Sequence, residues 1–156
     1  MFGLDLRQDK GQAFVELALV LPIFILLLVG AVEIGRLAYA SIEVSNAARA
    51  GVAYAAQNHT TAKDSTNITL AATQDAPDIT SLTATPSYSC SCESSTGTMT
   101  APAGCATVTL TSCPSPSRIV VYVQVTTQAP VNTLFGFPGI ASTVTLRGFA
   151  SMRTEQ

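Results

Sequence analysis

The chain has 156 residues, a net charge of −2 and only 12% charged residues, about half the share found in an ordinary soluble domain. Its eight lysines and arginines are scattered without a basic run, which argues against a nucleic-acid partner. The apolar residues concentrate in one early segment, whereas the middle of the chain is rich in serine, threonine, alanine and proline. The length favours a single domain outside that segment.

The early apolar segment, LALVLPIFILLLVGAV, lies between Glu16 and Glu33 and contains no charge. With residues 13–15 it reaches the roughly 20 residues that cross a bilayer. We therefore predict a membrane span over residues 13–32. The alternative is a buried core helix, but the rest of the chain is too polar to cover one.

A carboxylate at the start of a membrane span is costly to desolvate unless it is wetted or paired. Glu16 is such a carboxylate, and Gly11 precedes it by five positions. The segment KGQAFVE resembles the processing site of type IV prepilins, in which a membrane peptidase cuts after the glycine. The resemblance implies that residues 1–11 are a leader peptide and that Glu16 pairs with the new amino terminus on Gln12, usually that of a neighbouring subunit.

The longer segment GQAFVELALVLPIFILLLVGAVEIGR, residues 11–36, resembles the amino-terminal signature of TadE-like proteins, the pseudopilins of the tight-adherence (Tad) pilus system. The family pattern ends in an E-x-x-R pair at the far membrane edge, supplied here by Glu33 and Arg36. Three positions apart on a helix, these two residues share a face and are expected to form an ion pair. The resemblance implies a non-enzymatic component of a type IVc-like pilus assembly or secretion system. The implied partners are the lipid bilayer, a prepilin peptidase and other pilus or pseudopilin subunits.

The helix is predicted to continue beyond the membrane as a stalk, because residues 34–57 contain no proline and much alanine. One helix over residues 12–57 would be about 69 Å long at about 1.5 Å per residue. A stripe of mostly small side chains follows its second half: Leu37, Ala38, Ile42, Ser45, Ala48, Val52 and Ala55. Small side chains allow close approach, so the stripe packs either on the chain's own sheet or on other subunits.

Residues 58–118 form a region rich in serine and threonine, with short strand candidates at residues 79–85 and 106–111. Clearer strand candidates follow at residues 119–127 and 142–152, so we predict a carboxy-terminal β-hairpin over residues 119–156. The predicted fold class is α+β: a long amino-terminal helix, transmembrane in its first half, followed by a small extracytoplasmic domain built on an antiparallel sheet.

The segment between the two clearer strands, QAPVNTLFGFPGIA, predicts a loop with a hydrophobic tip. Phe135 and Phe137 at this tip either face a partner or the membrane, or tuck under their own sheet. Both readings remain open at the level of the sequence.

All four cysteines follow the membrane segment: Cys90, Cys92, Cys105 and Cys113. An even number in a loop-rich domain indicates two disulfides and an oxidising compartment. A bridge between Cys90 and Cys92 would close a very small ring, so each is expected to pair with Cys105 or Cys113. A zinc site is the alternative, but no two neighbouring cysteines have the usual gap of two to four residues, and we predict no metal.

The lysines and arginines near the two ends of the span nearly balance and do not fix its orientation. The cysteines and the prepilin resemblance place the amino terminus in the cytoplasm and the carboxy-terminal domain in the periplasm or outside the cell. The expected protein is therefore a single-pass protein of the inner (cytoplasmic) membrane.

Two other interpretations remain open. Ala38-Tyr39-Ala40 is an A-x-A site, and cleavage after Ala40 would make the apolar segment a removable signal peptide. The chain could also be a membrane-anchored extracytoplasmic binding domain that never enters a pilus. His59 is the single histidine, and the sequence contains no recognisable catalytic constellation. We expect no enzymatic activity and no cofactor.

Overall fold

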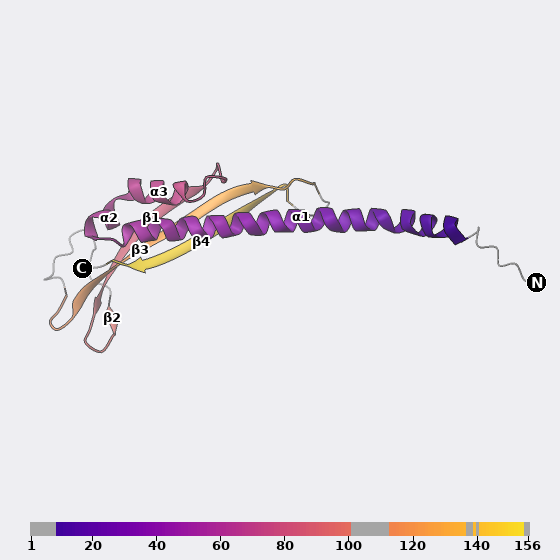
Figure 1. Ribbon diagram of the computed structural model, residues 1–156. Helices are drawn as coiled ribbons and strands as arrows, with labels where there is room; N and C mark the ends of the chain where they lie inside the picture. The colour runs from indigo at the N-terminus through magenta and orange to yellow at the C-terminus, as the bar shows by residue number, and fades with distance from the viewer. Residues whose placement is uncertain (1–8, 101–112, 137–138, 140, 155–156) are drawn as a thin grey trace, which may run out of the picture. The chain divides into compact units, whose positions relative to one another are not determined.

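The computed structural model describes residues 9–100, 113–136, 139 and 141–154, with side chains from Gly11 onward. The chain divides into two units, Met1–Ala38 and Tyr39–Gln156, and the second is hereafter the C-terminal unit. The elements in chain order are α1 (Asp9–Ala55), α2 (His59–Lys63), α3 (Ser65–Gln74), β1 (Thr83–Glu93), β2 (Met99–Thr100), β3 (Arg118–Asn132) and β4 (Thr143–Arg153) (Figure 1). The predicted α+β class is confirmed: a long apolar helix precedes a four-stranded antiparallel sheet.

Helix α1 is built mainly from leucine, alanine, isoleucine and valine, and Pro22 is the one proline inside it. Alanine and leucine are strong helix formers, and the uninterrupted helix follows from their frequency. The helix ends at Ala55, two residues before the predicted end, because Asn58 caps the next helix.

The sheet has the strand order β2-β1-β3-β4, so the long strand β3 lies between β1 and β4. All three pairings are antiparallel, and Val125 of β3 lies opposite Pro86 of β1 and Ala150 of β4. Along β3 the buried side chains alternate with half-buried ones, as expected for a strand whose two faces differ in burial. The buried set on one face is Ile119, Val121, Val123, Val125, Thr127, Ala129 and Val131.

The second half of α1 packs on that face of the sheet. A Cβ atom placed on Gly51 would lie 3.3 Å from Val125 Cγ1 and 3.3 Å from Ala72 Cβ, so the helix lies against β3 and α3 together. The main core combines helix and sheet residues: Val52, Ala55, Ala62, Ile68, Val123 and Val125. The small side chains of α1 therefore serve close packing onto the chain's own sheet.

The predicted stripe is partly confirmed. Its residues Ala48, Val52 and Ala55 are buried in the C-terminal unit, but Ile42 is 60% exposed. The buried face also contains Ala40, Val44 and Ala47, which the sequence pattern missed. The buried face of the helix thus includes Val44, whose carbonyl oxygen lies close to Gly148 of β4.

Helices α2 and α3 were not predicted from the sequence, because threonine-rich segments have low helix propensity. Their amino termini are nevertheless well capped. The Asn58 side chain accepts hydrogen bonds from the N–H groups of Thr60 and Thr61 at 2.9 Å, and the Thr61 hydroxyl accepts from the Asn58 N–H at 3.1 Å. Asp64 caps α3, and hydrogen bonds from the Asn67 side chain and backbone hold the pKa of its carboxyl below the usual range.

Two of the strand predictions need correction. Strand β1 covers residues 83–93 instead of 79–85, and β3 continues five residues past the predicted end at residue 127. Pro130 therefore lies inside a strand and not in a loop. Beyond Gln128, β3 is paired with β4 but not with β1, and proline is tolerated on such a locally exposed edge. The candidate strand at residues 106–111 lies outside the described residues.

Candidate membrane and assembly segment

The predicted processing site lies in the first turns of α1. Gly11 is exposed, and a Cβ added there would have no described atom within 4 Å. The Gln12 side-chain amide donates a hydrogen bond of 3.3 Å to Glu16 Oε1, one helical turn further on. The helix thus places Gln12 and Glu16 on one face, and residues 1–8 of the predicted leader lie outside the described residues.

The helix surface after Glu16 is apolar and uncovered. Every leucine, isoleucine, valine and phenylalanine side chain from Phe14 to Leu28 is between 43% and 73% exposed. A core helix of a soluble domain would bury this surface, but no part of the chain that the structure describes covers it. The helix from Gly11 to Ala55 is long and apolar enough to cross a membrane, and fits a single-pass membrane protein.

Glu33 and Arg36 mark the end of the apolar run. Arg36 Nη2 donates a hydrogen bond of 2.8 Å to Glu33 Oε1, at the i, i+3 spacing of neighbours on a helix face. Glu33 is buried and Arg36 is half-buried. The pair keeps the charge of the Glu33 carboxylate compensated where it is out of water.

Residues 11–53 match the family model described as TadE-like protein. The amino-terminal region of this chain is TadE-like. The match begins at Gly11, includes the whole apolar run, and ends within the part of α1 that packs on the sheet. It indicates a membrane protein associated with Tad pili. Comparison with curated proteins and with solved structures gave no match.

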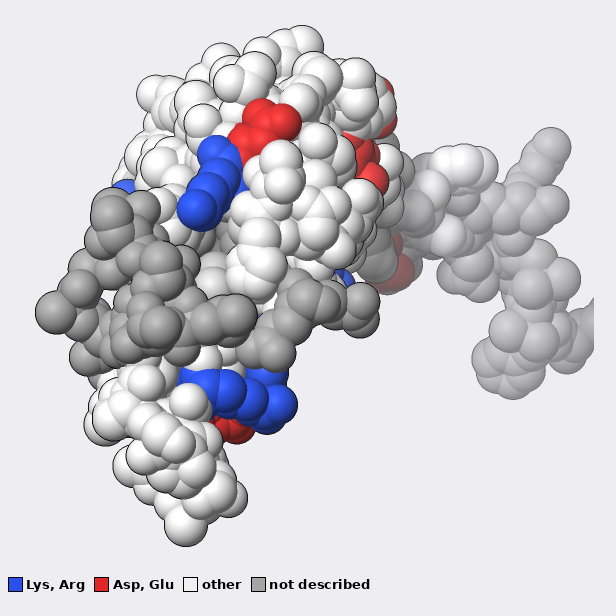
Figure 2. All heavy atoms as spheres, turned by 90° about the vertical axis from the view of Figure 1, so that its left-hand side faces the viewer, with Lys and Arg blue, Asp and Glu red and all other residues white. Residues whose placement is uncertain are grey.

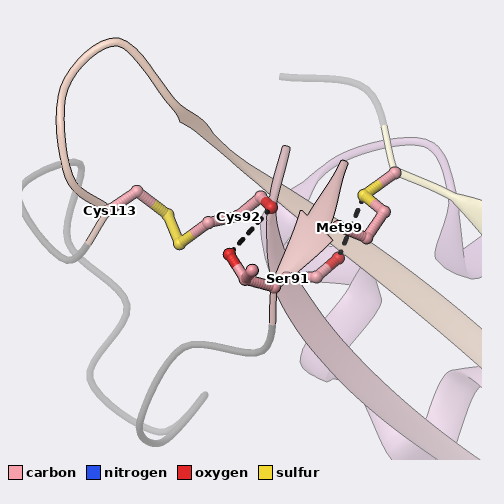
Figure 3. Close-up of a disulfide and its surroundings, with 5 residues drawn as sticks. Ser91, Cys92, Met99 and Cys113 are labelled. Atoms are coloured by element: carbon pink, nitrogen blue, oxygen red, sulfur yellow. Dashed lines mark hydrogen bonds between the residues drawn. A yellow bond between two sulfur atoms is a disulfide. The ribbon is translucent and has the colours of Figure 1, made fainter. Parts of the chain in front are cut away.

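The disulfide-bonded cysteines lie in the C-terminal unit, outside the TadE-like region. Cys92 on β1 is bonded to Cys113, and the bridge spans 21 positions of the chain (Figure 3). Cys90 is likewise disulfide-bonded, and Cys105 lies outside the described residues. Beside the bridge, Ser91 Oγ lies 3.6 Å from Met99 Sδ on β2. Cys92 and Cys113 are therefore oxidised, which removes their thiolates as zinc ligands.

Charged side chains are few at this end of the unit, and Figure 2 shows them as separate groups on a largely uncharged surface. Glu93 Oε2 accepts from Arg118 Nε at 2.7 Å, and Arg153 Nη1 lies 3.5 Å from the same oxygen. The three residues come from β1, β3 and β4, and they lie beside an open polar pocket lined by Glu93, Ser94, Ser95, Gly97, Pro116 and Arg118. Exposed ion pairs contribute little stability, and this one joins neighbouring strands at their ends.

Two residues that sequence reasoning missed connect α1 to the sheet. The Thr127 hydroxyl donates a buried hydrogen bond of 2.6 Å to the carbonyl oxygen of Val44. Gly148 on β4 lies so close to the helix that a Cβ there would be 2.5 Å from that same oxygen. A glycine inside a strand is the available sequence signal, since it often marks close backbone approach.

The predicted A-x-A site lies within α1. Ala40 is 5% exposed and belongs to the helix face that is buried in the C-terminal unit, while Tyr39 is exposed. Packing therefore accounts for the small side chain of Ala40, whereas Ala38 is exposed.

Proposed function

We propose that this chain is a non-enzymatic pseudopilin of a Tad pilus assembly or secretion system, anchored in the inner membrane with its amino terminus in the cytoplasm. A prepilin peptidase removes residues 1–11 by cutting after Gly11. The carboxylate of Glu16 then pairs with the ammonium group on Gln12 of a neighbouring subunit. The C-terminal unit faces the periplasm or the exterior.

The proposal rests on the exposed apolar helix that the TadE-like match covers from Gly11, in which the carboxylate of Glu16 lies on the same face as Gln12. In lipid, an unpaired carboxylate near the start of a span is costly. The Gln12 amide offers Glu16 a neutral partner, whereas cleavage would supply a cation at the same residue. The disulfide of Cys92 and Cys113 supports an oxidising compartment for the C-terminal unit.

Mass spectrometry of the membrane-extracted protein tests the cleavage. The expected mature chain begins at Gln12, and Gly11→Val should leave the precursor uncut, because a branched side chain replaces the glycine at the cleaved bond. Gly3→Val, a matched change inside the leader, should leave processing normal. A chain that keeps residues 1–11 would contradict the proposal and favour a plain membrane-anchored binding domain. A chain that begins at Ser41 would instead indicate signal-peptide cleavage.

Replacement of Glu16 tests the proposed pairing. Glu16→Ala should abolish incorporation into pilus assemblies, because the new ammonium loses its counter-charge, while carbonate extraction still finds the chain in the membrane. Glu43→Gln, a change of another carboxylate on the same helix, is the control and should leave assembly unchanged. Normal assembly of the Glu16→Ala chain would rule out the pairing.

A further inference from the structure

The β3–β4 loop follows Asn132, and its first residues, 133–136, present apolar side chains at one end of the C-terminal unit. Leu134 is 60% exposed and Phe135 is 43% exposed. The sequence has no charged residue between Arg118 and Arg147, so the loop itself carries no charge into an apolar phase.

The contacts of β3 with α1 show which end of the unit carries this loop. Val125 lies against Gly51, and Thr127 bonds Val44, so β3 and α1 run in opposite directions. From Thr127 the strand continues to the loop for about 20 Å at roughly 3.4 Å per residue. From Val44 the helix reaches Tyr39 in about 7.5 Å at about 1.5 Å per residue. The loop therefore lies at the end of the sheet that is near Tyr39, where α1 enters the C-terminal unit, and away from Ala55 (Figure 1).

The covalent chain keeps this end of the unit close to the membrane. Tyr39 follows Val32, the last residue of the apolar run, by seven positions. Even a fully extended connection of that length spans no more than about 25 Å. This limit on the position of Tyr39 does not depend on the angle between the two units, and the loop lies at the same end of the C-terminal unit as Tyr39.

We propose that the β3–β4 loop is a second membrane contact, in which Leu134 and Phe135 enter the interfacial region of the bilayer that holds α1. Aromatic and aliphatic side chains on an uncharged turn partition to the level of the lipid headgroups and upper acyl chains. The C-terminal unit is then held at two points, the helix and the loop. Its sheet is fixed in orientation to the membrane before any other subunit binds.

The chain contains no tryptophan, so single tryptophan variants report on one position each. The full-length Phe135→Trp chain is reconstituted in phosphatidylcholine vesicles with or without brominated acyl chains. We expect bromine to remove roughly half of its emission, since interfacial side chains lie about 5–10 Å into the headgroup and acyl boundary. Leu134→Trp is an independent second reporter and should behave in the same way.

Phe149→Trp is the matched control. Phe149 is 63% exposed, lies on β4 and is opposite Thr126 in the sheet, six residues past the start of β4 at Thr143. Its emission should be unaffected by bromine and fully accessible to acrylamide in the water. Intact disulfides in each variant confirm that the unit is folded.

The proposal is overturned if both loop reporters are quenched no more than the control, whether they are open to acrylamide or shielded by a second copy of the chain. Equal quenching of all three reporters would also overturn it, because it would mean that the unit adsorbs without a specific loop contact. Neither result bears on the cleavage after Gly11, which mass spectrometry tests separately.

Discussion

At the scale of single residues, the contact between α1 and the sheet depends on two residues of the sheet, Thr127 and Gly148. The first needs its hydroxyl group, and the second needs its small size. Thr127 contributes a hydroxyl that is buried but satisfied by the carbonyl oxygen of Val44, so its burial carries no unpaired-group penalty. Gly148 has no side chain, and the helix backbone at Val44 and Ser45 occupies the space that a side chain would need. Thr127 and Gly148 are direct cross-strand partners in the pairing of β3 with β4.

Gly148→Ala should therefore destabilise the C-terminal unit. The added Cβ would lie 2.5 Å from both Thr127 Oγ1 and Val44 O, and overpacking of this kind typically costs about 1–3 kcal/mol. Urea unfolding of the full chain in detergent, followed by tyrosine absorbance, measures the change. Gly136→Ala is the control, because a Cβ there would have no described atom within 4 Å, and its effect should stay within about 0.5 kcal/mol. Equal midpoints for the two variants would contradict the close approach.

At the scale of elements, α2 and α3 show how short helices form in a segment of poor helix propensity. Each begins at a side chain that satisfies free backbone N–H groups, Asn58 for α2 and Asp64 for α3. Ile68 and Ala72, one turn apart on α3, are buried against α1. Capping and this small apolar contact together hold the segment over the core.

Asn58→Ala should weaken this helical pair specifically. Loss of an N-cap costs about 1 kcal/mol. For amide groups that exchange when α2 and α3 open, this corresponds to roughly fivefold faster hydrogen exchange. Hydrogen exchange of the full chain in detergent measures the effect. Asn46→Ala, at an exposed position within α1, should leave exchange in α2 and α3 unchanged. Equal exchange in both variants would show that packing alone holds the helices.

At the scale of the whole molecule, the two ends of the C-terminal unit are held by different means. At the end near Tyr39 and Val44, α1 packs directly on the sheet. At the other end, the described residues form a small buried cluster of Cys90, Ile119 and Val121, with Cys113 against it. A cluster of that size buries little apolar surface, so we expect the bridge between Cys92 and Cys113 to contribute to the stability of this end.

The double variant Cys92→Ser/Cys113→Ser should lower the stability of the unit by about 2–4 kcal/mol, because the bridge restricts a long loop in the unfolded chain. Urea midpoints of the two chains give the comparison. Reductant added to the wild-type protein should lower its midpoint at least as far, since Cys90 is also disulfide-bonded. An unchanged midpoint in the double variant would mean that packing, and not the bridge, holds this end.

The sequence by itself determined the parts of this protein that depend on local composition. The apolar run between Glu16 and Glu33 predicted a long membrane helix, and the GQAFVELALVLP segment predicted the TadE-like region. A stretch of β-branched residues from Ile119 predicted the central strand. Each signal lies in consecutive residues, because a span, a motif and a strand are defined by neighbours along the chain.

Only the tertiary structure decided the features that join distant residues. It decided that Cys92 pairs with Cys113, since the sequence allowed other pairings. It also decided that Pro130 lies in β3, because β1 no longer pairs with the strand there, and that Gly148 meets Val44. The physical reason is that close packing and cross-links depend on which surfaces meet in space, and composition and periodicity along one chain do not specify that.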